Sequence, residues 1–543
     1  MIFKELIGQL PKIIDVLGQV RTQAQNYPKL IEELQKWGLD PTQPPDKPDA
    51  IYAWSIVKYY DKSQQKQLMI NLLGEDEIKK TFLENFNAND LPNFLKQAKD
   101  FIVGRGLPAE FREKKVDLRP EIQDFSRIYT KVAKWTRPVL EVLSDAEFSD
   151  LPEYSDYPKE FQALIQKKIE SFCGREFVFQ QIQQFIYRNS NGYFTIVGDA
   201  GMGKSTIAAK YVSDKKFPCY FNIRAEGRNR PELFLDSLRQ QLINRYWLQN
   251  AKDDNLQTLL QKVSDNLLDD ERIVIVVDAL DEVEKKYGDE NILNLPTTLP
   301  NKVYFLLTRR PYIENNKRLY IQGVPEEELD LRSQEYGDLS RQDIENYIWF
   351  FVQENPKTKD SLSKWIQERE KAPLTFVNEI AERSENNFMY LYHLLPGIAK
   401  GEYNDVPLEK FPKGLQEYYQ THWRRMGMDT QNNDKETKDK KTRDRMVFIL
   451  FIFVQISSPI SCEMIAEIAG QDKYDVQKVL DEWIEYLKPQ EKNREIRYSI
   501  YHTSFLDFLK RKRDLDKNQT LLAEIKQRIV EYFDKKMESD GRA

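Results

Sequence analysis

The sequence predicts a multidomain α/β protein, with a parallel sheet in its central part and helical segments before and after it. Apolar runs rich in β-branched residues alternate with helix-like stretches between about residues 158 and 325, at 195–199, 218–225, 272–279 and 303–310. This alternation is typical of a parallel sheet with helices on both faces. Outside this part, apolar residues recur at spacings of three and four, which favours helices.

Composition limits the classes of function. The chain has 543 residues, of which 40% are hydrophobic and 31% are charged, so we expect several cores and no bias toward disorder. The net charge of −6 argues against a nucleic-acid polyelectrolyte without excluding a local basic patch. The three cysteines show no CxxC spacing, which favours a reducing, cytoplasmic location and argues against a cysteine zinc site. The first histidine is His393, which excludes histidine-dependent catalysis in the N-terminal part.

A glycine-rich stretch, GDAGMGKST, follows the apolar run YFTIV and precedes a helix-like segment. It matches the pattern G-x-x-x-x-G-K-[ST], in which backbone N–H groups cradle phosphates at the start of a helix. Lys204 is expected to reach the β- and γ-phosphates, and Ser205 to ligate Mg²⁺. The predicted nucleotide-binding residues of this loop are Gly198, Gly201, Met202, Gly203, Lys204, Ser205 and Thr206.

A second motif supplies carboxylates for a metal and for water. ERIVIVVDALDE, residues 271–282, predicts a strand buried on both faces that ends at Asp278. Asp278 is expected to hold Mg²⁺, while Asp281 and Glu282 follow within a turn and are candidates to orient or polarise water. The alternative for these last two is a solvated loop acid.

A third apolar strand, KVYFLLTRRP at 302–311, ends in two arginines. An arginine at this edge can sense a γ-phosphate because its planar fork matches phosphate oxygens. We favour Arg310 for this role over Arg309, and the alternative for either arginine is a plain surface charge.

Together these motifs resemble the STAND NTPases, and within them the NACHT clade, over roughly residues 170–512. The resemblance rests on the ordered set FCGRE (172–176), GDAGMGKST, VVDALDE, LLTRRP, SENNFMYLYHLL (384–395), FPKGLQEYYQTHWRRM (411–426) and YHTSFLDFL (501–509). It implies binding of ATP or ADP with Mg²⁺. It also implies that Phe172, Cys173, Gly174 and Arg175 cup the adenine, and that His502 reaches the phosphates and holds a closed, ADP-bound state. A Gly-x-Pro motif of the family is missing, because KAPLTF (371–376) has Pro373 without the glycine.

The patterns and the resemblance predict six segments. They are an N-terminal helical effector or adaptor domain (1–157), a NACHT P-loop NTPase domain (158–325), a helical domain (326–428) in which Ser340 is expected to cap the first helix, a charged linker (429–445), a winged-helix domain (446–515) and a helical tail (516–543). The longest apolar stretch, VFILFIFVQI at 447–456, is too short to span a bilayer and predicts a buried helix. A C-terminal sensor array of repeats, usual in the family, is expected to be absent or to lie outside this chain.

The resemblance implies a slow, Mg²⁺-dependent ATPase that acts as a switch, closed with ADP and oligomerising with ATP, in innate immune, anti-phage signalling. Its expected partners are further copies of itself, an unknown trigger and a downstream effector recruited by the N-terminal domain, with nucleic acid unlikely to be a partner. One alternative is a DNA-binding AAA+-like ATPase that uses the winged helix for replication or transcription control. Another is a scaffold whose nucleotide is never hydrolysed.

Overall fold

The computed structural model divides the chain into two compact units, 1–159 with 239–271, and 160–238 with 272–543. Residues 239–271, which lie inside the predicted NTPase segment, thus group with the N-terminal helices, and the six predicted boundaries stay predictions. Most of the predicted linker lies outside the described residues. The structure describes all residues except 1, 23–26, 37, 41–42, 63–66, 89, 114–115, 135–157, 247, 249, 268–270, 284–290, 313–318, 429–439, 457, 493–494, 513–519 and 541–543.

The first unit is helical, as its apolar periodicity predicts. Tyr52, Phe82, Phe125 and Tyr129 form an aromatic centre in which Phe82 and Phe125 lie 5.1 Å apart. Rings packed edge to face at this distance stabilise a helical core. The N-terminal helices are α1 (Ile2–Thr22), α2 (Tyr27–Lys36), α3 (Pro48–Lys62), α4 (Gln67–Leu73), α5 (Asp76–Asn87), α6 (Leu91–Gly104), α7 (Pro108–Glu113) and α8 (Leu118–Ala133).

Helix α8 also contacts the segment 239–271 of the same unit. Arg119, which is buried, forms an ion pair of 2.7 Å with Glu271 and donates to the carbonyl of Asn266. Gln123 donates to the carbonyl of Arg245 at the end of α13 (Pro231–Tyr246). These polar contacts attach α8 to the region around α14 (Leu256–Asp265).

The centre of the second unit is a five-stranded parallel sheet with the order β2-β3-β4-β1-β5. All residues of β1, β3 and β4 are buried, which is the pattern of strands covered on both faces. The four predicted strands are confirmed, and a fifth follows directly after the predicted NTPase segment. The strands are β1 (Gly192–Val197), β2 (Cys219–Phe221), β3 (Ile273–Asp278), β4 (Val303–Arg309) and β5 (Glu326–Asp330).

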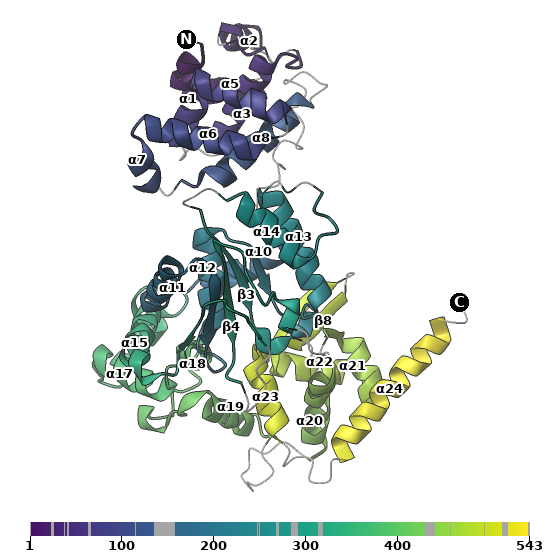
Figure 1. Cartoon of the computed structure of the whole chain (residues 1–543). Helices are drawn as coiled ribbons and strands as arrows, with labels where there is room; N and C mark the ends of the chain where they lie inside the picture. The colour runs from purple at the N-terminus through teal and green to yellow at the C-terminus, as the bar shows by residue number, and fades with distance from the viewer. Residues whose placement is uncertain are drawn as a thin grey trace. The chain divides into compact units, whose positions relative to one another are not determined.

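Helices of the same unit surround this sheet and continue after it (Figure 1). The prediction that Ser340 caps a helix is wrong: α15 already begins at Gly337, because a turn of 3-10 helix capped by Ser333 leads into it, and Ser340 lies buried inside α15. The helices up to the predicted linker are α10 (Lys159–Ile169), α11 (Glu176–Arg188), α12 (Lys204–Lys215), α15 (Gly337–Gln353), α16 (Lys359–Gln367), α17 (Pro373–Ser384), α18 (Phe388–Ala399) and α19 (Gly414–Arg425).

The C-terminal part, residues 440–512, is here called the C-terminal module. Residues 447–455 of its apolar stretch lie in a helix and are largely buried, as predicted. The order of helices and hairpin is compatible with a winged helix, which stays a prediction. The elements are α20 (Lys440–Gln455), β6 (Ile460–Ser461), α21 (Cys462–Ala469), α22 (Lys473–Glu482), β7 (Leu487–Lys492), β8 (Glu495–Ile500) and α23 (Thr503–Arg511), with β6-β8-β7 forming an antiparallel sheet.

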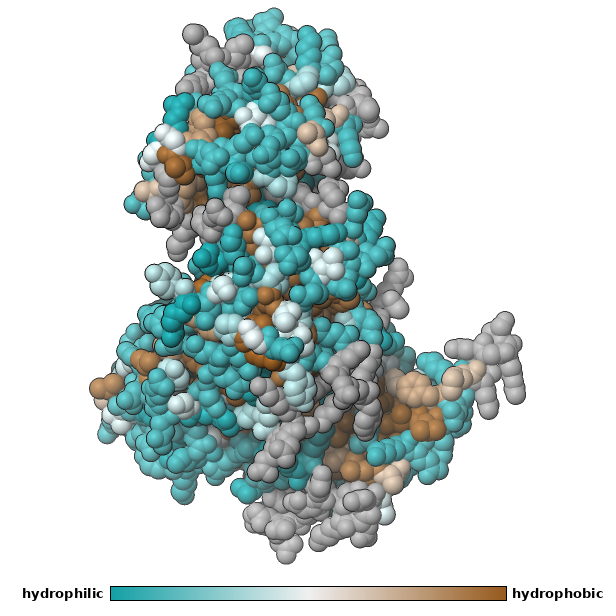
Figure 2. All heavy atoms as spheres, viewed as in Figure 1, coloured by the Kyte–Doolittle hydropathy of each residue, from teal (hydrophilic) through white to brown (hydrophobic). Residues whose placement is uncertain are grey.

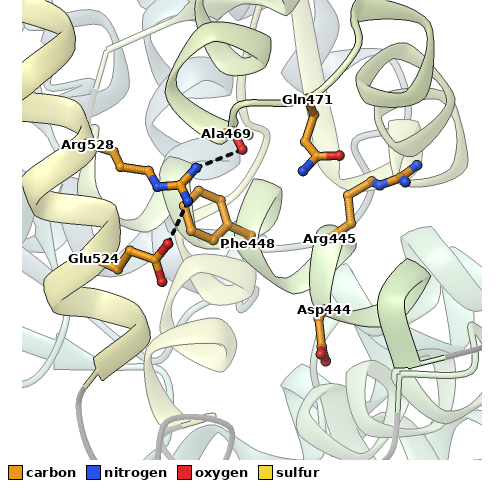
Figure 3. Close-up of a pocket in the computed structure, with 7 residues that line it drawn as sticks. All are labelled: Asp444, Arg445, Phe448, Ala469, Gln471, Glu524 and Arg528. Carbon is orange, nitrogen blue, oxygen red and sulfur yellow. Dashed lines mark hydrogen bonds and ion pairs between the residues drawn. The ribbon is translucent and has the colours of Figure 1, made fainter.

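A last helix, α24 (Thr520–Asp540), packs on the C-terminal module. Arg528 of α24 donates to the carbonyl of Ala469 and pairs with Glu524 beside a cavity of about 460 Å³ (Figure 3). The cavity lies between α20, α21 and α24 and contains none of the predicted site residues. The visible surface of the protein is mainly polar, with apolar side chains gathered over α24 (Figure 2). No helix of the described residues is long and apolar enough to cross a membrane.

Candidate nucleotide site

The glycine-rich loop connects β1 to α12 at the carboxyl edge of the sheet. Gly201 and Gly203 have φ angles of 88° and 90°, a left-handed conformation that favours glycine. A Cβ atom on Gly201 would lie 2.3 Å from the Asn387 side chain. Gly198 follows the last residue of β1, while Ser205 and Thr206 lie in the first turn of α12. The loop thus has the conformation that the phosphate-binding pattern predicts.

The carbonyl groups of this loop are bound by residues from three directions. Lys204 donates through Nζ to the carbonyls of Gly198 and Asp199, at 2.7 and 2.9 Å. Arg175 donates to the carbonyl of Met202 at 2.9 Å. At the start of α18, Asn387 donates to the carbonyl of Ala200, and the backbone N–H of Phe388 donates to that of Gly201. These contacts fix the carbonyl groups of the loop, whose glycine-rich pattern is typical of backbone N–H groups that bind an anion.

Asp278 lies at the end of β3, where its side chain is held by the neighbouring strand. The Thr308 hydroxyl donates to Asp278 Oδ1 at 2.5 Å and accepts the backbone N–H of Ala279 at 2.9 Å. Asn222 at the end of β2 donates to the carbonyl of Asp278. Asp278 is buried, and these contacts fix its position at the end of β3.

Asp281 and Arg310 form a contact between the sheet edge and the C-terminal module. The Arg310 backbone N–H donates to Asp281 Oδ1 at 3.0 Å, and the Arg310 Nε lies 3.1 Å from Oδ2. The same guanidinium pairs with Asp507 and donates to the Thr503 hydroxyl, both on α23. Arg310 therefore holds a carboxylate of the site and a helix of the C-terminal module at once.

Two groups of the site have shifted proton affinities. Burial raises the pKa of Glu282 to about 7, although the backbone N–H of Arg224 donates to its carboxylate. Burial lowers the pKa of Lys204 to about 8, despite the nearby charge of Asp281. Both pKa shifts have desolvation as their main cause, and acids and bases with shifted pKa values are typical of catalytic and binding sites.

His502 caps α23 and has a defined tautomer. Its Nδ1 accepts the backbone N–H of Ser504 at 3.2 Å, so the neutral ring carries its proton on Nε2. The Ser504 hydroxyl lies 2.7 Å from the same Nδ1 and 2.8 Å from the Tyr419 hydroxyl. Burial, aided by the charges of Lys168 and Arg310, holds the pKa of His502 well below its ordinary range. His502 is therefore an uncharged donor, and Lys204 is among the charges that lower its pKa.

The FCGRE segment leads into α11 in the chain and contacts the P-loop and α15. Arg175 is buried, donates to the Ser340 hydroxyl at 3.1 Å and has a backbone N–H that donates to Asp343. Burial raises the pKa of Cys173 to about 12, which leaves the thiol protonated and inert. Phe172 lies beside Phe179 of α11, with centroids 6.0 Å apart. The adenine-binding role of Phe172, Cys173, Gly174 and Arg175 stays a prediction.

Arg309 does not converge with the other site residues. Its guanidinium pairs with Glu328 of β5 and lies 3.7 Å from the centroid of the Tyr312 ring. Sequence reasoning also missed several residues that the fold brings to the site. Thr308, Asn387, Thr503 and Asp507 lie within segments of the family resemblance but were not singled out as site residues, while no local pattern marks Asn222 and Lys168.

The residues present fit a magnesium nucleotide. Among the described residues, nothing hydrogen-bonds the Ser205 hydroxyl or Asp278 Oδ2, and hard oxygen atoms of this kind are the ligands that Mg²⁺ prefers. Lys204 supplies a partly desolvated ammonium at the start of α12, where phosphates bind. Magnesium bound here would neutralise phosphate charge.

Two family models match parts of the chain. The model of NACHT N-terminal helical domain 5 matches residues 2–139, and that of the nephrocystin 3 N-terminal region matches residues 174–310. With the loop geometry and the motif order, they define the second unit as a nucleotide-binding P-loop NTPase. More particularly, a NACHT-type N-terminal helical domain followed by these nucleotide motifs supports a STAND/NACHT-type NTPase.

Similarity to individual proteins is distant. A curated WD repeat-containing protein of Nostoc sp., itself uncharacterized, is 27% identical over 122 residues, which span 22% of this chain and 8% of the Nostoc protein. A STAND protein with a tetratricopeptide repeat sensor from Pyrococcus horikoshii is 16% identical over 67% of this chain and 45% of that one, with a TM-score of 0.26. The RuvB branch migration motor of Thermotoga maritima is 13% identical over 64% of this chain and 96% of that one, with a TM-score of 0.22. At these scores the solved structures add nothing to the assignment.

Proposed function

We propose that this chain is a nucleotide-dependent molecular switch. At rest it holds ADP in a closed form, and when triggered it exchanges ADP for ATP, opens and oligomerises. Hydrolysis of ATP with Mg²⁺ held by Ser205 and Asp278, and with Glu282 as the group that activates water, returns it to rest. Slow turnover suits a switch, because the state must persist long enough to be recognised.

The observation that carries this proposal is the double contact of Arg310. This arginine holds Asp281, at the end of the sheet, and Asp507 on α23 through one guanidinium. His502, one residue before α23, lies in the same electrostatic cluster as Lys204. A phosphate chain bound by Lys204 would therefore share this cluster with the C-terminal module, so the number of phosphates can bias opening. A ligand shifts such an equilibrium only by its difference in affinity for the two forms.

The wider role rests on analogy with the NACHT type. We propose a cytoplasmic protein whose oligomer gathers the N-terminal helical domains and so recruits or activates an effector in innate immune, anti-phage signalling. The trigger is a ligand or protein that binds the open form more tightly. Fold alone does not fix a pathway, so this step depends on finding the trigger.

The test is to denature freshly purified protein and identify the released nucleotide by chromatography. The parent protein is expected to release one ADP per chain. The variants Lys204→Ala and His502→Ala are expected to release little or none. Ser461→Ala is the matched control, because Ser461 caps α21 of the C-terminal module as His502 caps α23. If His502→Ala retains ADP, or if the parent contains no bound nucleotide, the proposal of a closed, ADP-bound form is wrong.

The rival function is a DNA-binding ATPase, and the charges of the module do not favour it. The charged residues of α22 are Lys473, Asp475, Lys478, Asp481 and Glu482, in which acids outnumber bases. A helix that enters a DNA groove usually carries a basic face. A DNA-binding assay at several salt concentrations separates the two functions, because phosphate contacts make affinity depend steeply on salt.

A further inference from the structure

Helix α10 precedes the FCGRE segment. It is not part of any of the nucleotide-binding motifs identified in the sequence. Its inner face is formed by Phe161, Ile165 and Lys168, which follow one another at helical spacings of four and three. Phe161 and Ile165 are fully buried. The ring of Phe161 packs 5.4 Å from that of Phe221, the residue paired with Asp278 across β2 and β3. The face that carries Lys168 is therefore anchored at the carboxyl edge of the sheet.

The last turn of α10 also contacts the C-terminal module. Lys167 places its Nζ 4.7 Å from the centroid of the Tyr501 ring, and Tyr501 precedes His502. Lys168 follows Lys167 and points to the inner face, since Phe161 and Ile165 fix that side of the helix. Lys168 thus lies between the end of the sheet and the residue that caps α23.

The surroundings of Lys168 are those of the nucleotide site. The negative charges of Asp278 and Glu282 act against the lowering of the pKa of Lys168, and the charge of Lys168 in turn helps to lower the pKa of His502. Burial lowers the pKa of Lys168, so its ammonium is partly desolvated. Among the described residues, no hydrogen bond or ion pair engages its Nζ.

A structural role does not account for this placement. A lysine in the last turn of a helix interacts favourably with the helix dipole. It would do so equally well on the solvated outer face of the helix. The two carboxylates that act on Lys168 are held by other groups, because the Thr308 hydroxyl donates to Asp278 Oδ1 and the backbone N–H of Arg224 donates to Glu282. Among the described residues, neither carboxylate forms an ion pair with Lys168. A desolvated ammonium without a protein partner lies where an anion can bind it.

We propose that Lys168 is a further phosphate-binding residue, whose ammonium donates to the phosphate chain of a nucleoside di- or triphosphate. This inference rests on the proposed function and adds a second lysine to the site. It couples α10 to the bound nucleotide, since the phosphates and the end of the sheet then hold the same helix. Lys204 and Lys168 reach the phosphates from different elements, α12 and α10.

The test is the affinity of the full chain, freed of bound nucleotide, for ADP and for a non-hydrolysable ATP analogue, measured by calorimetry. Lys168→Gln is expected to weaken binding at least about tenfold, the usual scale for a charge-assisted hydrogen bond. Lys168→Arg keeps the charge and is expected to retain most of the affinity, which a packing role would not explain. Lys167→Gln is the matched control and is expected to change affinity by less than about twofold, because an exposed lysine contributes little.

The outcomes separate the two proposals. If the parent binds and Lys204→Ala does not, while Lys168→Gln binds as tightly as the parent, Lys168 does not touch phosphate and this inference falls alone. Equal losses in Lys168→Gln and Lys168→Arg with lowered thermal stability would also overturn it, because the residue would then act through packing. A parent that binds neither nucleotide overturns the proposed function together with this inference.

Discussion

Asp507→Asn removes a charge that holds the C-terminal module against the sheet, and it leaves every predicted nucleotide-binding side chain in the protein, including its partner Arg310. The Arg310 and Asp507 side chains are 26% and 33% exposed, so their ion pair lies between a surface pair, at about 0.2–1 kcal/mol, and a buried one. Arg310 keeps Asp281 in the variant, so only one of its two ion pairs is lost. We therefore expect the closed form to lose about 1 kcal/mol, which is about a fivefold shift in the equilibrium.

The assay is the dissociation of a fluorescent ADP analogue from preloaded protein, followed by stopped flow with excess unlabelled ADP. Dissociation limited by opening should become about fivefold faster in Asp507→Asn. Asp475→Asn is the matched control, because Asp475 forms an ion pair with Arg445 inside the C-terminal module. An unchanged rate in Asp507→Asn, in a variant that melts like the parent, would refute the role of Arg310 in closure. If ADP dissociation became equally faster in both variants, the cause would be a general destabilisation of the C-terminal module.

Three further predictions concern the same site. The kcat/KM for ATP should rise with pH through about 7, as Glu282 loses its proton, and fall above about 8, as Lys204 loses its own; a flat profile measured by steady-state ATPase assay would contradict both assignments. Asn387→Ala removes the cap of α18 and a donor to the P-loop, so the free energy of unfolding measured in urea should fall by about 1–2 kcal/mol. An unchanged free energy would mean that these hydrogen bonds do not stabilise the loop. Tyr419→Phe removes the outer hydroxyl of the chain that reaches His502 and should weaken ADP binding about fivefold at a cost of about 1 kcal/mol; calorimetry with unchanged affinity would exclude that chain.

The sequence was sufficient to predict most of the sheet because its inner strands are apolar. Strands β3 and β4 are buried along their whole length, so each begins with a continuous run of apolar residues that hydropathy detects. Strand β5 was not predicted, since its sequence is EEELD and only Leu329 is fully buried. An edge strand is exposed on its open side and can be this polar, so hydropathy alone does not find it.

The residues of the candidate site also fall into those that the sequence predicts and those that only the structure shows. Residues with a fixed local pattern, such as Lys204 and Asp278, were predicted from spacing, whereas His502 came only from the family resemblance. Thr308 and Asp507 reach the site through strand register and helix packing, which a single sequence does not encode in a short window. Ser340 was taken for a cap because serine often starts helices, yet it is buried and accepts from Arg175.

The attachment of α18 to the P-loop limits which parts of the protein can move. The backbone N–H groups of Phe388 and Met389 both donate to the Gly201 carbonyl, and Asn387 donates to that of Ala200. Pulling α18 away would leave these carbonyls without partners while exposing the unsatisfied start of a helix. The loop and α18 should therefore travel as one rigid body, and the hinge of any opening motion must lie beyond α18 in the chain. A spin label on α18 would then keep its distance to the loop while one on α23 changes it.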